Sequence, residues 1–399
     1  MTRHWYLLLL ALLSVALVGC PSTPTASNDD GKPAATDGET SDAGEAQDAT
    51  EPPAETDDGE EPADGTEPAD EVEPADGTEP ADGEEPPTAD GEEGSGSESQ
   101  TPSKSFESIK IAGHEGSIRS LAFSPDGKYL ATGGGEDMNV KIWEVATGEG
   151  VRQLLGHEGW VWALAYSPDS KIIASGDGDK KIIVWNAETG DEIRRLEGHG
   201  HRILDLAFSP DGKQLLSASS DKTLKLWNVE TGKEVRTFNG HYNEVWAGKF
   251  NAKGDQIISA SSDYNVKIWN AATGDALQTL EGHWLRVYDV AFSPDSKWAV
   301  SAAQDKVLRI WDLSAGRTSK KLEGHQDWVA GVAVSPDGKQ IASAGSDMIT
   351  RLWDAKSGEL QHEIKTQWGV ISDVAYSPDG KKLATSSWDG TIRIWDLTE

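Results

Sequence analysis

Short segments of alternating apolar and polar residues fill the chain from about residue 108 to its end. IRSLAF (118–123) and VWALAY (161–166) alternate with a period of two, as do NVKIW (139–143) and TLKLW (223–227). This period places successive side chains on opposite faces of a strand, so the segments are predicted to be β-strands. The SPDGK and Thr-Gly or Ser-Gly sequences between them are typical of tight turns. Because no helical period accompanies them, the pattern predicts an all-β domain.

The alternating segments belong to a repeat of 42 residues, which occurs seven times. Tryptophan recurs at this interval, at Trp143, Trp185, Trp227, Trp269, Trp311, Trp353 and Trp395. An aspartate precedes each tryptophan by six residues, at Asp137, Asp179, Asp221, Asp263, Asp305, Asp347 and Asp389. A Gly-His pair opens six of the units, at His114, His157, His199, His241, His283 and His325. Each unit is too small to bury its own apolar face, so the units are expected to stack.

These motifs resemble the WD-repeat family, and the resemblance covers residues 105–399. It implies a seven-bladed β-propeller with four-stranded antiparallel blades. In this family a buried Trp, a Ser or Thr, the His and the Asp of one repeat form a hydrogen-bonded tetrad. By resemblance we assign five complete tetrads: His157, Ser175, Asp179 and Trp185; His199, Ser217, Asp221 and Trp227; His241, Ser259, Asp263 and Trp269; His283, Ser301, Asp305 and Trp311; His325, Ser343, Asp347 and Trp353.

The first and last repeats depart from this pattern. An extra glycine in the first repeat places Thr132 five residues before Asp137, and the last repeat has Thr385 but carries Gln367 where histidine is expected. The chain ends after the third strand of the last repeat. Residues 108–111 resemble the outer strands of other repeats, so we expect them to complete the last blade and leave no free sheet edge.

Eight of the 16 tryptophans are neither repeat residues nor part of the N-terminal leader. Trp160 and Trp162 flank Val161, so if Val161 faces the core, both rings point the other way. In the family such positions lie on the top face, where partners bind. The resemblance and the clustering of Trp, Tyr and Arg, which dominate binding hot spots, predict a partner-binding surface. It comprises Arg119, Trp160, Trp162, Arg202, Trp246, Trp284, Arg286, Tyr288, Trp328, Trp368 and Trp388, whereas Trp298, inside a strand, is expected to be structural.

Residues 1–20 have the features of a secretory leader. A short basic start is followed by an apolar run at residues 7–18 and by Leu-Val-Gly-Cys, which contains the only cysteine, Cys20. This quartet resembles the lipobox of bacterial lipoproteins, which implies cleavage before Cys20 and its lipidation. The alternative is an ordinary signal peptide with an incidental cysteine. The lipobox predicts a lipid-anchored protein of the bacterial cell envelope, and Pro21, which is not the aspartate of inner-membrane retention, favours the outer membrane.

Residues 21–104 are strongly acidic, with 27 Asp and Glu against two Lys, and contain no aromatic residue. Such a segment cannot bury enough apolar surface to fold, so we expect a disordered tether. A surface-export tag and a weak cation sponge are the alternatives. Residues 105–399 hold 41 acidic and 33 basic residues without a basic stripe, which argues against nucleic acid as a ligand.

No catalytic or phosphate-binding motif occurs, and the repeat histidines are assigned to tetrads. We therefore expect no enzyme activity, no metal and no cofactor. The predicted function is a non-catalytic, monomeric scaffold that binds a protein or peptide of the cell envelope. Arg119, Arg202 and Arg286 favour an acidic peptide. Two alternatives are carbohydrate binding by stacked indoles and an accessory role in an envelope assembly or enzyme complex.

Overall fold

The computed structural model describes residues 106–365 and 369–398. These residues form 28 strands, arranged as seven four-stranded antiparallel sheets. Among them there is no helix of the length and apolarity needed to cross a membrane. The predicted leader, Cys20 and the acidic tether lie outside the described residues, and so do Gln367 and Trp368.

Each sheet is one blade, and the first six blades are consecutive in sequence. Blade 1 comprises β2 (Ile118–Phe123), β3 (Tyr129–Gly134), β4 (Val140–Glu144) and β5 (Gly150–Leu154). Blade 2 comprises β6 (Val161–Tyr166), β7 (Ile172–Asp177), β8 (Ile182–Asn186) and β9 (Glu192–Leu196). Blade 3 comprises β10 (Ile203–Phe208), β11 (Gln214–Ser219), β12 (Leu224–Asn228) and β13 (Glu234–Phe238). Blade 4 comprises β14 (Val245–Phe250), β15 (Gln256–Ser261), β16 (Val266–Asn270) and β17 (Ala276–Leu280).

The remaining blades follow the same plan. Blade 5 comprises β18 (Val287–Phe292), β19 (Trp298–Ala303), β20 (Leu308–Asp312) and β21 (Arg317–Leu322). Blade 6 comprises β22 (Val329–Val334), β23 (Gln340–Gly345), β24 (Thr350–Asp354) and β25 (Leu360–Ile364). Blade 7 comprises β26 (Ile371–Tyr376), β27 (Lys382–Ser387), β28 (Thr391–Asp396) and β1 (Ser108–Ala112). The expected seven-bladed propeller is confirmed.

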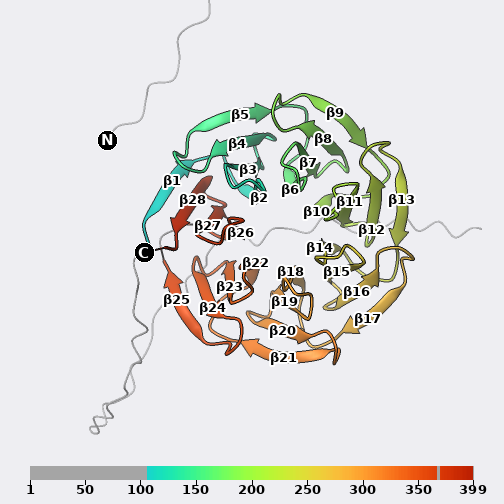
Figure 1. Cartoon of the computed structure of the whole chain (residues 1–399), viewed down its shortest axis with the longest axis vertical. Coiled ribbons are helices and arrows are strands. Elements are labelled where there is room, and N and C mark those ends of the chain that lie inside the picture. The colour runs from blue at the N-terminus through green and yellow to red at the C-terminus, as the bar shows by residue number, and fades with distance from the viewer. Residues whose placement is uncertain (1–105, 366–368, 399) are drawn as a thin grey trace, which may run out of the picture. The chain divides into compact units, whose positions relative to one another are not determined.

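The blades surround a central axis, and their first strands lie closest to it (Figure 1). The outermost position is taken by β5, β9, β13, β17, β21, β25 and β1 (Figure 1). Strand β1 pairs antiparallel with β28, from Ser108 opposite Trp395 to Ala112 opposite Thr391. The first strand of the domain therefore completes the last blade, as the sequence predicts, and β28 has no free edge.

The core lies between neighbouring blades rather than inside any one of them. Seven clusters of buried apolar side chains are present, and each joins two adjacent blades. Trp227 of blade 3, for example, packs with Ala174 and Val184 of blade 2. The seven repeat tryptophans are all buried, from 0% exposed at Trp311 to 8% at Trp143. A large buried ring per blade explains why the repeat needs tryptophan at a fixed interval.

Candidate binding surface

A β-bulge in the innermost strand of every blade positions the side chains at the axis. In blade 1, Ile118 pairs with Gly134 and Ser120 pairs with Gly133, so Arg119 is left out of the ladder. A register shift occurs at the same place in all seven blades. The extra residues are Arg119, Trp162, Leu204, Trp246, Tyr288, Ala330 and Ser372. Bulges of this kind redirect a side chain out of the regular alternation.

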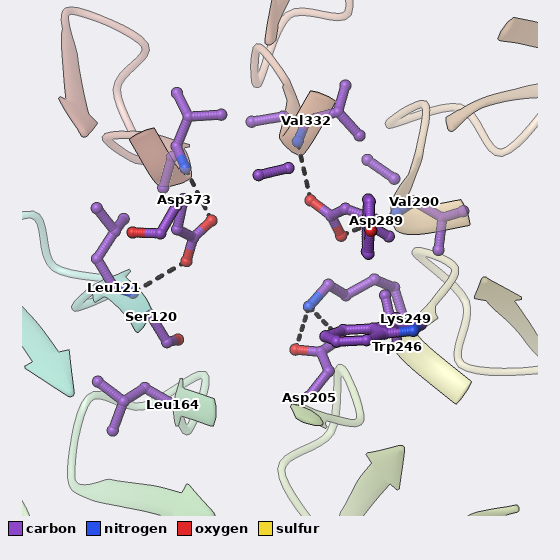
Figure 2. Close-up of a pocket in the computed structure, with 18 of the residues that line it drawn as sticks. Ser120, Leu121, Leu164, Asp205, Trp246, Lys249, Asp289, Val290, Val332 and Asp373 are labelled. Carbon is purple, nitrogen blue, oxygen red and sulfur yellow. Dashed lines mark hydrogen bonds and ion pairs between the residues drawn. The ribbon is translucent and has the colours of Figure 1, made fainter. Parts of the chain in front are cut away.

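These bulge residues surround a cavity of about 600 Å³ on the propeller axis. Seven of the eleven residues predicted to bind a partner line it: Arg119, Trp162, Trp246, Arg286, Tyr288, Trp328 and Trp388. Figure 2 shows how its walls are formed by side chains from the inner strands of different blades. Cavities of this size, with aromatic walls and a few polar groups, are typical ligand sites.

Ring contacts connect the aromatic residues around the cavity. Trp246 contacts Tyr288 with their centroids 5.1 Å apart, and Tyr288 contacts Trp328 at 5.3 Å. Trp328 in turn lies 5.8 Å from Trp388. On the other side, the rings of Trp160 and Trp162 are stacked, with centroids 6.2 Å apart and planes 25° from parallel. We call these six residues together with Arg119 the aromatic rim.

Arg119 joins the two parts of the aromatic rim. Its guanidinium carbon lies 4.4 Å from the ring centroid of Trp388, 4.5 Å from that of Trp162 and 5.2 Å from that of Trp160. The rim is therefore continuous from Trp246 in blade 4 through blades 5, 6, 7 and 1 to Trp160 beside blade 2. Such cation–π contacts restrict the movement of both the guanidinium and the three indole rings.

The aromatic rim remains accessible. Trp160 is 37% exposed and Trp388 is 38% exposed, whereas Val161, which lies between Trp160 and Trp162 in the sequence, is completely buried. Trp246 is fixed further, because its Nε1 donates a hydrogen bond to Ser262 Oγ at 2.7 Å. Exposed aromatic rings in fixed positions lose little conformational entropy when they bind a partner.

Three of the predicted arginines pair with no carboxylate of the described residues. The side chains of Arg119, Arg202 and Arg286 form no hydrogen bond or ion pair with any residue that the structure describes, and the buried Nε of Arg119 is unsatisfied. Burial lowers the pKa of Arg119 to about 10, with Glu136 opposing this shift and Arg202 adding to it. Arg119 therefore stays positively charged at neutral pH, with its donors free.

The cavity also contains three aspartates and one lysine that the sequence analysis missed. Asp205, Asp289 and Asp373 each accept a hydrogen bond from a backbone N–H of the next blade, at Gly248, Val332 and Leu121 respectively, all at 2.9 Å (Figure 2). Lys249 Nζ lies 2.7 Å from Asp205 Oδ1. The signal was present, because these aspartates stand at one position of the repeat, two residues after its first core Val or Ile.

The predicted tetrads are present as hydrogen-bonded chains in blades 3 to 6. The histidine Nδ1 lies 2.7 to 3.0 Å from the aspartate, and its Nε2 lies 2.6 to 2.8 Å from the serine Oγ. Each tryptophan Nε1 donates to the same Oγ at 2.8 Å. In blades 3 to 5, because a carboxylate only accepts, Nδ1 carries the proton and the serine O–H donates to Nε2. In blade 6 the guanidinium of Arg351 also lies 2.7 Å from His325 Nδ1. Burial alone raises the pKa of Asp263, but the hydrogen bond from His241 lowers it to about 2.

One tetrad assignment is wrong. In blade 2, His157 Nδ1 bonds Asp177 Oδ2 at 2.7 Å, and Asp179 is not its partner. Asp177 ends β7 and is completely buried, and its Oδ1 accepts from the backbone of Asp179 and Lys181, both at 2.9 Å. Asp177 and Asp179 are only two residues apart, so spacing in the sequence did not distinguish them. Asp177, which lies on the strand, is the one that reaches the imidazole of His157. Blade 1 retains its series of hydrogen bonds despite the extra glycine, with His114 Nε2 2.8 Å from Thr132 Oγ1.

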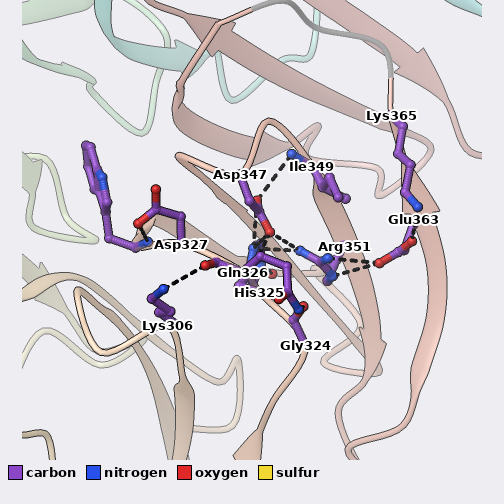
Figure 3. A network of polar contacts seen from close by, with 12 residues as sticks. Lys306, Gly324, His325, Gln326, Asp327, Asp347, Ile349, Arg351, Glu363 and Lys365 are labelled. Carbon is purple, nitrogen blue, oxygen red and sulfur yellow. Dashed lines mark hydrogen bonds and ion pairs between the residues drawn. The ribbon is translucent and has the colours of Figure 1, made fainter. Parts of the chain in front are cut away.

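Blade 6 adds an ion-pair network to its tetrad (Figure 3). The buried Arg351 donates to Asp347 Oδ2 at 2.6 Å and pairs with Glu363 Oε1 at 2.9 Å. Burial lowers the pKa of His325, and Arg351 adds to this effect although Asp347 opposes it. His325 is therefore held neutral, as a structural hydrogen-bonding group requires. Among the described residues, no group of three His, Cys, Asp or Glu is placed to hold a metal ion.

The remaining predicted residues lie away from the cavity wall. Trp284 is 66% exposed and Arg202 is also exposed, but neither lines the cavity. Trp160 reaches the cavity only through Trp162 and Arg119. Trp298 packs, partly buried, against the cluster between blades 5 and 6.

Comparison with known proteins places these observations in a family. The profile of the WD domain, G-beta repeat (WD40), matches seven segments: residues 105–144, 148–186, 190–228, 232–270, 274–312, 316–354 and 358–396. Among curated proteins, a Ribosome biogenesis protein BOP1 homolog of Drosophila virilis is 42% identical over 53 residues, which are 13% of this chain and 7% of the relative. The Ribosome biogenesis protein erb1 of Botryotinia fuckeliana is 54% identical over 37 residues, 9% of this chain and 5% of the relative.

The chain thus spans less than a tenth of the length of these relatives, and each match is about the size of one repeat. The likeness is that of the repeat itself. The seven profile matches agree with the seven blades, their interblade tryptophans and their hydrogen-bonded tetrads. This chain belongs to the WD40 repeat family.

Proposed function

We propose that this protein is a non-catalytic binding module of the bacterial cell envelope, which is anchored by lipid on Cys20 and binds a protein or peptide through the aromatic rim. The WD40 fold is consistent with a protein-binding scaffold. Fold alone selects no partner, so the proposal depends on the site.

The aromatic rim is the observation that carries the proposal. Five of its six aromatic rings and Arg119 line a cavity of about 600 Å³, Trp160 stacks on Trp162 beside it, and none of these rings is a repeat tryptophan of the interblade core. The indoles of Trp160 and Trp388 are partly exposed, so they present apolar surface to solvent that a partner could cover. Concentrated Trp, Tyr and Arg in a recess is the composition of binding hot spots.

The partner segment is proposed to be acidic where it meets the rim. Arg119, Arg202 and Arg286 have no internal carboxylate partners among the described residues, so their donors are available to a ligand. Arg119 is also held in place by three indoles, which reduces the entropy lost when it binds a carboxylate. Binding is expected to weaken as salt is raised, because salt screens partly exposed charges.

Carbohydrate binding is a second candidate, favoured by a separate group of exposed rings. Tyr242 is 82% exposed and Trp284 is 66% exposed, and both follow the Gly-His pair of their blade. Flat exposed rings of this kind suit the apolar faces of sugars. If these two rings bind sugar, substitution of both by Ala is expected to abolish binding to a glycan array. If the aromatic rim alone is the binding site, the same substitution is expected to leave glycan binding unchanged.

The ribosome biogenesis for which these relatives are named is not proposed for this chain, because the shared segments are about one repeat long. An accessory role in an envelope assembly or enzyme complex remains compatible with the same surface, since such a subunit also binds protein. The identity of the captured partner distinguishes it from a free-standing scaffold.

The anchor is tested separately from the rim. Lipidation of Cys20 predicts that metabolically supplied radiolabelled palmitate is incorporated and that the wild-type chain sediments with outer membranes. The Cys20→Ser variant is expected to incorporate no label and to be recovered in the soluble fraction. Label on the variant would contradict lipidation at this residue.

The binding role is tested by crosslinking in envelope extract. Wild-type protein, the Trp160→Ala/Trp162→Ala variant and Tyr264→Ala, which removes an exposed ring outside the rim, are compared for what they capture. The rim variant is expected to lose one or more proteins that the other two retain. Identical captures by all three would remove the proposed site.

A further inference from the structure

The three aspartates of the cavity wall are not equally paired with basic side chains. Lys249 pairs with Asp205, but Asp289 and Asp373 form no ion pair with any basic side chain that the structure describes. The carboxylate of Asp289 accepts hydrogen bonds only from the backbone N–H groups of Val290 and Val332, at 2.8 and 2.9 Å. That of Asp373 accepts from its neighbour Val374 and from Leu121 in the same way. Arg119, Lys249 and Arg286 also line the cavity, but these two carboxylates have no ion-pair partner among the described residues.

The electrostatics reflect this imbalance. Burial raises the pKa of Asp289 to about 6, although Lys249 opposes the shift, and the charge of Asp205 adds to it. Burial together with the charge of Asp289 raises the pKa of Asp373 to about 7. Burial alone would lower the pKa of Lys249, but its attraction to Asp205 and Asp289 raises it instead. The carboxylates of the cavity therefore stabilise the charged form of Lys249.

Aromatic faces line the same cavity next to these carboxylates. Trp246, Tyr288, Trp328 and Trp388 all contribute to its wall. A positive charge near a ring face gains cation–π attraction, and the gain is greatest where water is excluded. The space of about 600 Å³ accommodates a side chain with a long apolar stem. Because the described residues offer no group arranged for a metal ion, an organic cation is the ligand that fits.

We propose that the cavity binds the ammonium or guanidinium group of a lysine or arginine side chain from the partner, with the charge between Asp289 and Asp373 and the stem against the rings. This inference rests on the proposed function, since the side chain belongs to the segment bound by the aromatic rim. Arg119, Arg202 and Arg286 then contact acidic residues on either side of it. The expected recognition sequence is a basic residue flanked by Asp or Glu.

The direct test uses two small probes that differ in charge alone. N-acetyl-arginine N-methylamide and its citrulline counterpart, which is nearly isosteric and neutral, are titrated into the full chain at pH 8 and followed by ligand-observed NMR. The arginine probe is expected to bind at least about tenfold more tightly. Equal affinities, or no binding of the arginine probe at millimolar concentration, would overturn the inference.

Substitutions in the cavity give effects of opposite sign. Asp289→Asn and Asp373→Asn are each expected to weaken arginine binding by about tenfold. Lys249→Met releases the carboxylate of Asp205 and is expected to strengthen it. Asp211→Asn removes one negative charge from an exposed turn and serves as the matched control, with unchanged affinity. Because disruption of the fold cannot strengthen binding, the Lys249 variant keeps the test informative if an Asp variant is unstable.

A pH series on the wild-type chain needs no substitution. Asp289 and Asp373 gain protons between pH 8 and 5.5, so affinity for the arginine probe is expected to fall severalfold. Among the other groups that face the cavity, Arg119 remains positive, burial keeps Tyr288 and Tyr376 neutral, and Lys249 remains positive because its pKa is raised. Asp205, which bonds Lys249, and Arg286 also line the cavity. Constant affinity across this range would contradict the inference.

The outcomes separate this inference from the proposed function. A chain that captures its partner through the aromatic rim but binds both probes equally retains the proposed function and refutes the cation site. A chain that prefers the arginine probe, but whose rim variants capture the same proteins as the wild type, retains the cation site and refutes the rim as the protein-binding surface.

Discussion

The guanidinium carbon of Arg119 lies 4.4 Å from the ring centroid of Trp388, which links the first blade to the last on the surface that we propose binds a partner. The same group lies 4.5 Å from the ring of Trp162 in blade 2. One side chain therefore holds aromatic residues of two other blades. Its position depends on ring closure, because Arg119 and Trp388 come from opposite ends of the domain.

Arg119→Met tests this relationship, because it keeps a long apolar stem and removes the charge. The free energy of unfolding in urea is expected to fall by only about 1 kcal/mol, as the cation–π contacts are lost. Binding of an acidic partner is expected to weaken tenfold or more and to lose part of its salt dependence. A variant that binds as the wild type does at low salt would show that Arg119 contacts no ligand.

Blade 2 offers a comparison of two neighbouring aspartates. Asp177→Ala is expected to cost about 1–3 kcal/mol of stability, because His157 and two backbone N–H groups lose a buried acceptor. Asp179→Ala removes a side chain that does not bond this histidine, and a cost below about 0.5 kcal/mol is expected. Chemical denaturation of both variants provides the measurement. A larger loss for the Asp179 variant would restore the assignment made from spacing.

The seam between β1 and β28 provides another pair of neighbours. Ile111 is 6% exposed and packs with Ile118 and Ile392, whereas Lys110 faces outward. Ile111→Ser is expected to destabilise the domain by about 2–4 kcal/mol, and deletion of residues 105–112 is expected to cause aggregation through the unpaired edge. Lys110→Ser should have little effect. Light scattering and thermal melting report both results, and an unchanged melting temperature after the deletion would refute closure by β1.

The carboxyls of Asp289 and Asp373 predict a specific pH dependence of stability. Their pKa values are higher in the folded chain than the usual 3.8 of an aspartate, so folding favours the protonated form. This contribution to stability is complete below about pH 3.8 and is lost as the pH rises from there to about 6 to 7. Asp373→Asn removes the charge permanently. We expect its free energy of unfolding to exceed that of the wild type by more at pH 8 than at pH 5. Other groups titrate in both proteins, so the difference between them is the quantity to follow. A difference that is constant with pH would contradict the assignment.

The sequence was sufficient for the fold because the constraint repeats. A buried ring at Trp185, Trp227 and every equivalent position can be satisfied only by sheets packed side by side, and seven equally spaced tryptophans predict seven sheets. The alternation around Val161 also predicted that Trp160 and Trp162 share a direction, and they are stacked in the structure.

Contacts between repeats were less accessible from the sequence. The carboxylate of Asp373 accepts a hydrogen bond from the backbone N–H of Leu121 across the seam, and no sequence pattern in either segment predicts this contact. The importance of Asp289 depends on a cavity that exists only when seven inner strands converge. In blade 2, spacing could not choose between Asp177 and Asp179, because the choice depends on which of them remains on the strand.

The central claim is that the aromatic rim is the binding surface, and the affinity of the captured partner for rim variants tests it most directly. The dissociation constant is measured by calorimetry for the wild type, for Trp162→Ala/Trp388→Ala and for Tyr242→Ala, which removes a ring that is 82% exposed outside the rim. The rim variant is predicted to weaken binding by at least about 30-fold, as loss of hot-spot residues does, and Tyr242→Ala is predicted to leave it unchanged. Equal dissociation constants for the wild type and the rim variant, with both proteins folded, would contradict the claim.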